Sequence, residues 1–226
     1  MPMPWSTRPV DRSDDPPGSW RGDGNRPLDE AANGRVEQWC DRTESGERDT
    51  VSPEIRAIES ADSDRYLIGF EYRLKGRDRI KEKVAAYMDY KGSTADEALS
   101  TVKDAIRYTF VYKEDRYADG VREDLGRMED RGFEQVEVRN SWTSDQYKGI
   151  NSRWREPNTG LLVEVQFHTK VSFEAKQLTH GAYERLRSGQ TGEFEQIALE
   201  AFQKKIFGAV PIPPGATDIP DYPERE

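Results

Sequence analysis

The sequence contains one cysteine, Cys40, and two histidines, His168 and His180. A single cysteine excludes an internal disulfide framework, and two histidines exclude a metal site built from several imidazoles. We interpret Cys40 as incidental, without a role as nucleophile or ligand. The phosphate-binding patterns G-x-x-x-x-G-K-[ST] and G-x-G-x-x-G and the zinc pattern H-E-x-x-H do not occur either. Chemistry is therefore expected from carboxylates, cations and aromatic side chains.

Long apolar runs are also missing. No run approaches the roughly 20 residues of a membrane span, and the N-terminus lacks the apolar stretch of a secretory signal. We expect a soluble, cytoplasmic protein without a membrane partner, unless a leader or a larger fusion was trimmed away. The formal net charge of −9 argues against a general electrostatic grip on nucleic-acid phosphates but leaves room for a local basic groove.

Proline is nearly absent from the middle of the chain. Of the 13 prolines, only Pro157 lies between residues 54 and 210. Residues 1–53 are rich in proline, glycine and charge, a mixture that is typical of a flexible arm. We therefore predict one ordered domain at 54–210, large enough for a single core, preceded by this arm and followed by a proline-rich tail at 211–226.

The stretch 147–169 predicts two strands joined by a hairpin. Pro157 and Gly160 lie in the connecting turn, where proline presets φ and glycine accepts a positive φ. Side chains alternate along the second strand, with Leu161, Val163, Val165 and Phe167 on one face and Glu164, Gln166 and His168 on the other. We interpret the first face as core and the second as chemistry, with Tyr147 on the neighbouring strand. Any half-buried strand shows the same alternation, so other segments must decide between function and simple structure.

The remaining hydrophobic patterns predict strands and helices in mixed order. Residues 65–75, 104–112 and 133–138 have the alternation, or the aromatic and β-branched content, of strands. Helices are expected at 77–91, which Gly92 follows, and at 94–102, 117–132, 171–187 and 194–201. Together with the hairpin, this pattern predicts an α+β or mixed α/β fold, a five-stranded mixed sheet covered by helices.

Carboxylates and cations gather at the predicted strand ends. Asp104 opens one strand and Glu164 faces outward from another, and two carboxylates on adjacent strands are a common way to hold Mg²⁺ beside substrate phosphates. The opposite charge that a triphosphate needs is available from Arg73, Lys75, Arg79 and Lys83. Each feature has a simpler alternative: a cap for Asp104, a surface position for Glu164, and a solvated face for the cations.

Five ordered motifs together resemble the synthetase domain of RelA/SpoT proteins. They are "YRLKGRDRIKEK" at 72–83, "DAIRYT" at 104–109, "YKGIN" at 147–151, "EVQFHT" at 164–169 and "HGAYE" at 180–184. The resemblance covers about residues 65–187. It implies a mixed sheet related to nucleotidyltransferases and transfer of the β,γ-pyrophosphate of ATP to the ribose 3′-hydroxyl of a purine nucleotide, such as GDP, GTP or an adenine nucleotide.

The resemblance also implies roles for individual residues. Arg73 matches the arginine that stacks on adenine, and Lys75 and Lys83 match lysines on the ATP phosphates. Asp104 matches the Mg²⁺-binding aspartate, and Glu164 matches the glutamate that activates the acceptor hydroxyl or holds metal. Tyr147 matches the tyrosine on which the acceptor base stacks. The further expected contacts are Arg79 and Arg107 for ATP, and Lys148, Asn151, Gln166, His168 and His180 for the acceptor, with Thr169 on another family position.

The sequence departs from the family pattern at three places. Asn151 replaces the histidine of Tyr-x-x-x-His, His168 replaces the arginine of Glu-x-Gln-x-Arg-Thr, and Thr109 stands where a strand arginine is usual, with Arg107 as the nearest cation. These changes leave the identity of the acceptor nucleotide undecided. The family's hydrolase half and its His-Asp metal motif are missing. Short, altered synthetases of this kind resemble toxins of toxin-antitoxin or polymorphic toxin systems, or the secreted nucleotide pyrophosphokinases of actinomycetes. The resemblance to toxins implies an antitoxin or immunity protein as a partner.

Two other functions stay open. The acceptor could be the 3′ end of tRNA, with cations at Arg153, Arg155, Lys176, Arg185 and Arg187, although the acidic net charge argues against it. The chain could instead be a non-catalytic nucleotide-binding module. The presence of both Asp104 and Glu164 counts against that alternative, because a binder without turnover does not need both carboxylates.

Overall fold

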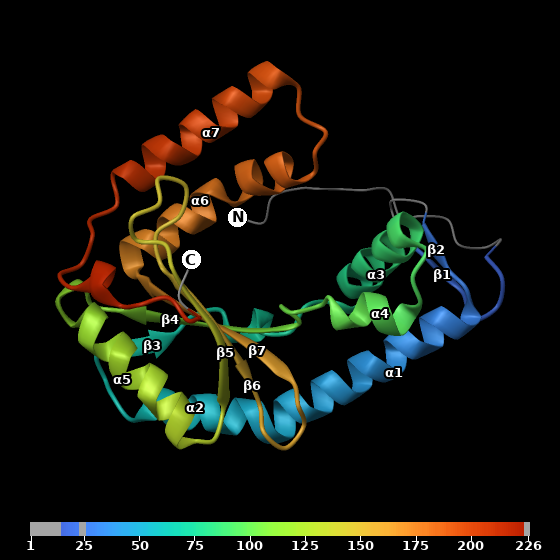
Figure 1. Cartoon of the computed structure of the whole chain (residues 1–226), viewed down its shortest axis with the longest axis horizontal. Coiled ribbons are helices and arrows are strands. Elements are labelled where there is room, and N and C mark those ends of the chain that lie inside the picture. Colours follow the sequence, from blue (N-terminus) through green and yellow to red (C-terminus); the bar gives the residue numbers. More distant parts are fainter. Residues whose placement is uncertain (1–14, 23–25, 224–226) are drawn as a thin grey trace.

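A five-stranded sheet organises the computed structural model, which describes residues 15–22 and 26–223 (Figure 1). The strand order is β3-β4-β7-β6-β5. The bounds are Arg65–Leu67 for β3, Ile106–Tyr112 for β4, Glu134–Asn140 for β5, Ile150–Arg155 for β6 and Leu162–Thr169 for β7. β4 and β7 run parallel, whereas the other neighbouring pairs are antiparallel. The predicted five-stranded mixed sheet is therefore confirmed, including the hairpin of β6 and β7. Tyr147 is not on the strand as predicted, because β6 begins at Ile150 and Tyr147 lies in the loop before it.

Helices precede and follow the strands. The helices are α1 (Glu30–Gly46), α2 (Ser52–Ser60), α3 (Arg77–Lys91), α4 (Ala95–Ser100), α5 (Tyr117–Asp130), α6 (Lys170–Arg187) and α7 (Glu193–Gly208). The five helices that the hydrophobic stripes predicted correspond to α3 to α7, whereas α1 and α2 were not predicted. α3 ends at Gly92, whose φ of 61° places it in the left-handed conformation. α4 begins with a capping box between Thr94 and Glu97. Within the described ranges, every helix is too short or too polar to cross a membrane.

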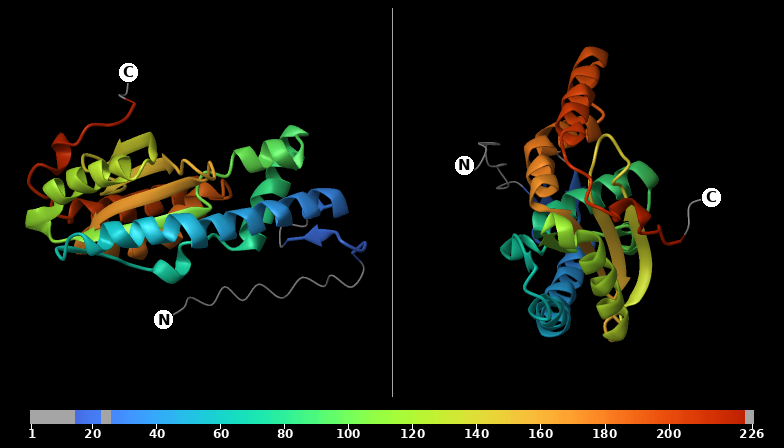
Figure 2. Two further views of the ribbon diagram at one scale, coloured as in Figure 1. Left: turned by 90° about the horizontal axis from the view of Figure 1, so that it is seen from below. Right: turned by 90° about the vertical axis from the view of Figure 1, so that its left-hand side faces the viewer.

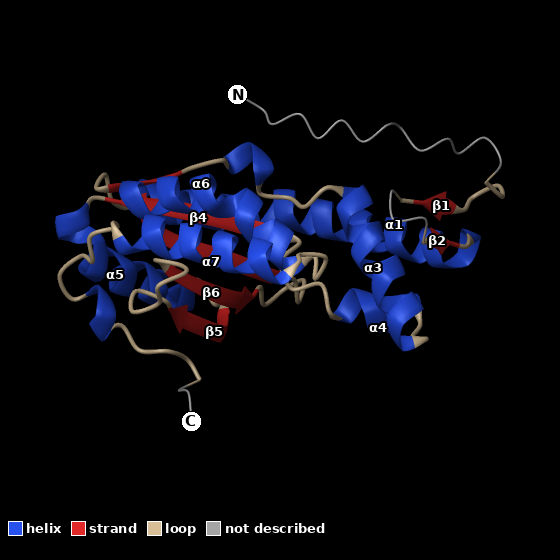
Figure 3. Cartoon of the chain, turned by 90° about the horizontal axis from the view of Figure 1, so that it is seen from above, coloured by secondary structure: helices blue, strands red, loops and turns tan. Residues whose placement is uncertain are grey.

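The sheet has an apolar face and a polar face. The apolar face packs on α2 and α5 and includes Ile106, Tyr108, Phe110, Val163, Val165 and Phe167. Because side chains alternate along a strand and Arg107 pairs with Glu164 across the parallel β4–β7 ladder, both lie on the polar face. α6 covers part of this second face, and α7 packs on α6 (Figure 3). Polar residues of β7 are consequently enclosed between the sheet and α6.

A second hydrophobic cluster lies beside the sheet, and it corrects the prediction that residues 1–53 form a flexible arm. β1 (Trp20–Arg21), β2 (Pro27–Leu28), α1, α3 and α4 bury Trp20, Leu28, Val36, Cys40, Ile80, Val84 and Leu99 together. The prediction failed because the composition is polar, whereas Ala32, Val36 and Cys40 repeat at helical spacing and pack inward. Residues 1–14 and 23–25 of the predicted arm lie outside the described residues.

Cys40 lies on the buried face of α1, with 1% of its surface exposed. Burial raises the pKa of its thiol to about 11, so the thiolate that a nucleophile or ligand needs does not form at neutral pH. Its contribution is to packing.

The predicted single strand at 65–75 is also wrong. The chain leaves β3 after Leu67, turns at Gly69 with φ 65°, and forms a 3₁₀ turn at Phe70–Tyr72 before Leu74 pairs with Ile106. A glycine in the left-handed conformation breaks a strand, although the apolar alternation continues through it. The turn brings Arg73 and Lys75 to the beginning of β4.

The C-terminal tail packs against the sheet. Ala216 and Ile219 are buried in the main core, and the backbone of Tyr222 pairs with Val138 of β5. The tail thus covers an edge that would otherwise offer unpaired backbone groups. Residues 224–226 of the predicted tail lie outside the described residues.

Candidate active site

Asp104 lies at the junction of the two hydrophobic clusters, because Ala105 packs in the smaller cluster and Ile106 in the main core. Three cations from three elements converge on its carboxylate. Lys75 Nζ lies 2.6 Å from Oδ2, Lys83 Nζ of α3 lies 3.3 Å from Oδ1, and Arg107 Nη2 of β4 lies 3.4 Å from Oδ2.

These contacts decide the charge of Asp104. Burial alone would raise the pKa of the carboxyl, but the hydrogen bond and charge of Lys75, with the charges of Lys83 and Arg107, outweigh it and lower the pKa to about 2. The carboxylate is ionised at neutral pH. It is a hard anionic ligand in a strongly cationic surrounding.

Arg107 joins Asp104 to Glu164. Its Nε donates to Glu164 Oε1 at 3.0 Å, and the Gln166 amide donates to the same carboxylate oxygen. The two predicted carboxylates thus contact one guanidinium at the start of β4 and β7, and both remain partly exposed. Among residues 15–22 and 26–223 no group of three or more His, Cys, Asp or Glu could hold a metal ion. A cation at this pair would complete its shell with phosphate oxygens and water.

Arg73 has a partner that the sequence did not reveal. Its Nε donates to Oε1 of Glu47 at 2.6 Å, and its guanidinium lies 4.3 Å from the centroid of the Phe70 ring. Glu47 is fully buried in the π-helical turn Glu47–Val51, and Tyr108 and Ser52 also donate to its carboxylate. Glu47 was missed because it falls in the segment that was predicted to be an arm.

Arg79 is not brought to Asp104. It is 76% exposed on α3 and lies 3.6 Å from Glu82 of the same helix. Its predicted contact with ATP stays a prediction, and the structure gives it a position at the surface. Lys83, one turn further along α3, provides the cation at the carboxylate.

The hydroxyl of Tyr147 connects two of the departures from the family pattern. It donates to Asn151 Oδ1 at 2.8 Å and lies 2.9 Å from Nε2 of His168. Because its proton is directed at Asn151, Nε2–H of His168 is the donor to the hydroxyl oxygen, and Nδ1 lies 2.9 Å from Ser172 Oγ. Burial lowers the pKa of His168 well below its ordinary value, and the charge of Lys176 acts in the same direction. The imidazole is neutral at pH 7.

Gly149 allows this arrangement. Its φ is 153°, and a Cβ at this position would come 2.8 Å from Cε1 of His168. A side chain there would displace the imidazole or the loop, which explains why glycine stands in "YKGIN". The centroid of the Tyr147 ring lies 6.1 Å from that of the Phe207 ring of α7. The ring packing and the hydrogen bonds of the hydroxyl together fix the position of the Tyr147 side chain.

The remaining predicted acceptor contacts differ in position. Gln166 is 5% exposed between Glu164 and α6, and its carbonyl oxygen accepts from Lys176. Lys148 is buried, and its ammonium donates to the carbonyl of Trp142 at 2.6 Å, where it holds the loop before β6. His180 is exposed on α6. Lys176 was considered only as a tRNA contact, yet it lies within this site.

Tyr147→Phe is expected to lower the free energy of unfolding by about 1–3 kcal/mol, because it leaves the Nε2–H of His168 and the Asn151 carbonyl oxygen without a hydrogen-bond partner in a half-buried setting. Urea denaturation monitored by fluorescence would measure the change. Tyr66→Phe is the matched control, since Tyr66 is 47% exposed on β3. Equal stability of the two variants would contradict the hydrogen-bond chain described above.

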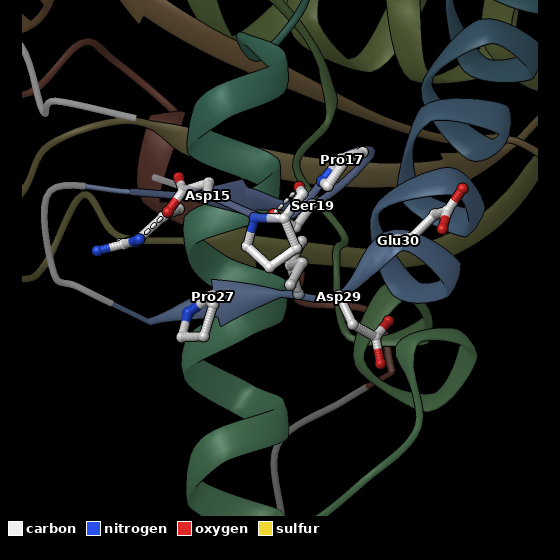
Figure 4. Close-up of a pocket in the computed structure, with 9 residues that line it drawn as sticks. Asp15, Pro17, Ser19, Pro27, Asp29 and Glu30 are labelled. Atoms are coloured by element: carbon white, nitrogen blue, oxygen red, sulfur yellow. Dashed lines mark hydrogen bonds and ion pairs between the residues drawn. The ribbon is translucent and has the colours of Figure 1, made fainter. Parts of the chain in front are cut away.

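A pocket elsewhere in the chain lies at the start of the described residues. It is lined by residues between Asp15 and Glu30, including Asp15, which is paired with Arg21 (Figure 4). Asp29 caps α1 by accepting from the backbone N–H of Ala32 at 2.7 Å. Asp15, Ser19 and Asp29 of this pocket therefore have structural partners, and neither Asp104 nor Glu164 lines it.

No protein-family model and no curated protein matches the sequence. Solved structures do match. A GTP pyrophosphokinase family protein from Streptococcus pneumoniae shares 17% identity and a TM-score of 0.55, covering 77% of this chain and 88% of that chain. Small alarmone synthetase 1 from Bacillus subtilis shares 16% identity and a TM-score of 0.53, covering 76% and 90%. The same synthetase bound to its product pppGpp gives 16% identity and a TM-score of 0.55, covering 76% and 91%.

Proposed function

Because the chain has the fold of the small alarmone synthetases, we propose that it transfers the β,γ-pyrophosphate of ATP to the ribose 3′-hydroxyl of a purine nucleotide. The observation that carries the proposal is that Asp104, just before β4, and Glu164 of the parallel strand β7 contact one guanidinium. Lys75 and Lys83 lie beside Asp104. The products are AMP and a 3′-pyrophosphorylated nucleotide of the (p)ppGpp or ppApp type.

The donor half of the site lies around Asp104. Lys75 and Lys83 enter from the turn before α3 and from α3 itself, and both are partly exposed. A triphosphate offers these ammonium groups several anionic oxygens in place of one carboxylate, which favours exchange of partner. Arg73 lies against Phe70 and is fixed by Glu47, so its planar guanidinium is oriented for stacking on the adenine.

Asp104 and Glu164 fit Mg²⁺, since Asp104 is ionised at neutral pH and both offer carboxylate oxygens. When bound, Mg²⁺ would neutralise charge on the transferring phosphates. Arg107 contacts both carboxylates and, with 42% of its side chain exposed, can turn toward the phosphates when a metal replaces it.

Glu164 is the group that we assign to proton transfer. Its carboxylate takes the proton of the acceptor 3′-hydroxyl while that oxygen bonds to the β-phosphorus of ATP. The bond between the β-phosphorus and the α,β-bridging oxygen breaks, and AMP leaves with the electron pair. Gln166 and Arg107 hold Glu164 in place, and Tyr147 is assigned to the acceptor base. Toxicity to a host cell, with an antitoxin or immunity partner, is part of the proposal.

The direct experiment incubates the purified protein with γ-labelled ATP, Mg²⁺ and one of GDP, GTP, ADP, AMP or deacylated tRNA. Labelled 3′-pyrophosphorylated nucleotide together with AMP is the expected product. ATP binding without any labelled product across this panel would favour a non-catalytic nucleotide-binding module instead. Labelled tRNA alone would replace the free nucleotide as the acceptor.

Salt dependence separates a free nucleotide from tRNA. Engagement of several tRNA phosphates gives a log-log slope of about −0.7 to −0.9 per phosphate contact, whereas a mononucleotide gives a shallow slope. We expect the shallow slope, because the chain carries a net charge of −9. Replacing Arg185 and Arg187 at the end of α6 by Glu should leave product formation from free nucleotides unchanged. A steep slope, with loss of cellular activity in this variant, would support the tRNA acceptor.

A further inference from the structure

Lys176 presents an ammonium group to the polar face of the sheet beside Glu164. It lies in the second turn of α6, and its hydrogen bond goes to the side-chain carbonyl of Gln166. Phe173 lies on the other side, with its ring centroid 5.6 Å from Nζ. An amide oxygen and an aromatic ring are weak partners for a cation that is largely removed from water.

The surroundings disfavour the charge of this lysine. Burial lowers the pKa of Lys176 to about 8, the charge of Arg107 acts in the same direction, and the charge of Glu164 opposes them. Such a cation lacks a close anion. A ligand anion next to Nζ would restore the stabilisation that the described residues do not supply.

The position of Lys176 indicates which ligand would supply the anion. Lys75 and Lys83 contact Asp104, on one side of Glu164. Gln166 and Lys176 lie on its other side, with Tyr147 and His168. Gln166 follows Glu164 by two residues of β7, which is about 6.6 Å along the strand. A ribose whose 3′-hydroxyl meets Glu164 places its 5′-phosphate, two bonds beyond the 5′ carbon, at a comparable distance.

Among the described residues, the other side chains on the Tyr147 side of the site offer no free positive charge. The imidazole of His168 and the amide of Asn151 are neutral and bonded to Tyr147. Lys148 is committed to the Trp142 carbonyl, and Arg153 of β6 is paired with Glu137. Within the described part of the chain, Lys176 is therefore the cation available to an acceptor phosphate.

We propose that Lys176 binds the 5′-phosphate of the acceptor nucleotide and makes that phosphate a requirement for efficient transfer. The inference rests on the proposed function. His168 and Asn151 stand where the family pattern has an arginine and a histidine. In this chain, Lys176 of α6 would supply the positive charge that these two positions lack. The same chemistry occurs in a free nucleoside monophosphate and in the phosphodiester of an RNA 3′ end, and we assign it to the free nucleotide.

The test combines a protein change with a ligand change. Lys176→Met keeps the length of the side chain and removes its charge. We expect the variant to lower kcat/KM for a purine nucleoside 5′-monophosphate by about 10- to 100-fold, as is usual for a lost charged hydrogen bond. The KM for ATP should not change, and kcat/KM for the corresponding nucleoside, which has no phosphate, should equal that of the wild type. Lys176→Arg should recover part of the loss.

Lys170→Met is the matched control, because Lys170 is exposed at the beginning of the same helix. An equal loss for nucleoside and monophosphate in Lys176→Met would overturn the proposal and indicate a structural role. An effect confined to deacylated tRNA would assign the phosphate to RNA and also overturn it.

Binding keeps this test separate from the proposed function. Calorimetric titration with the monophosphate alone measures the contact without turnover. If the wild type binds the monophosphate and Lys176→Met does not, the proposal is supported even when no product forms. Absence of product would contradict only the proposed pyrophosphate transfer. Equal monophosphate binding by both proteins overturns the assignment of Lys176.

Discussion

Glu164→Gln is expected to reduce pyrophosphate transfer by about 10³-fold while the fold stays intact, as for removal of a general base or a metal contact. The amide has nearly the same shape as the carboxylate, so it can keep a hydrogen bond with Arg107. It cannot take the proton of the acceptor hydroxyl, and it is a poorer ligand for Mg²⁺. Product formation under saturating ATP and acceptor measures the loss.

Glu174→Gln is the control for this variant. It makes the same chemical change at an exposed position of α6. Circular dichroism and urea denaturation should give the same curves for both variants. Near wild-type turnover in Glu164→Gln would show that the catalytic assignment is wrong.

Asp104→Asn should separate nucleotide binding from turnover. The amide removes the anion on which Lys75, Lys83 and Arg107 converge, so these cations become more available to phosphate oxygens. We therefore expect ATP binding in the absence of metal to persist or tighten. Turnover should fall by about 10³-fold, because a ligand for Mg²⁺ is lost. Calorimetric titration with ATP, with and without Mg²⁺, and the product assay measure the two quantities.

Asp119→Asn is the comparison for this variant, since Asp119 is an exposed residue of α5 at 3.5 Å from Arg122. It should leave both quantities unchanged. If Asp104→Asn loses ATP binding and turnover to the same extent, Asp104 serves to position the lysines and does not hold metal.

The polar face of the site was predictable, because strand alternation alone separates Glu164, Gln166 and His168 from the core residues of β7. The register could not be predicted. It places Arg107 opposite Glu164, which depends on the parallel pairing of strands far apart in the sequence. Alternation also does not indicate whether a polar face meets water, and here α6 covers part of it.

The missed partners come from two physical causes. Lys176 was considered only as a tRNA contact, because the helical stripe identifies the most apolar face and gives no sign of a second contact surface. Glu47 lies in a segment whose average composition is polar, although single side chains there reach the core. Composition is an average over many residues. Whether one carboxylate can be buried depends on the hydrogen bonds available at its own position.

α1, the π-helical turn and α2 form one continuous rod along the molecule, with its first part in the smaller hydrophobic cluster and its last part in the main core (Figure 2). Asp104 and Lys83 adjoin the smaller cluster, whereas Glu164 belongs to the sheet and Tyr147 to the loop before β6. The candidate site therefore spans two hydrophobic clusters. Local opening of the smaller cluster is expected to displace Lys83 and Asp104 while Glu164 stays on the sheet.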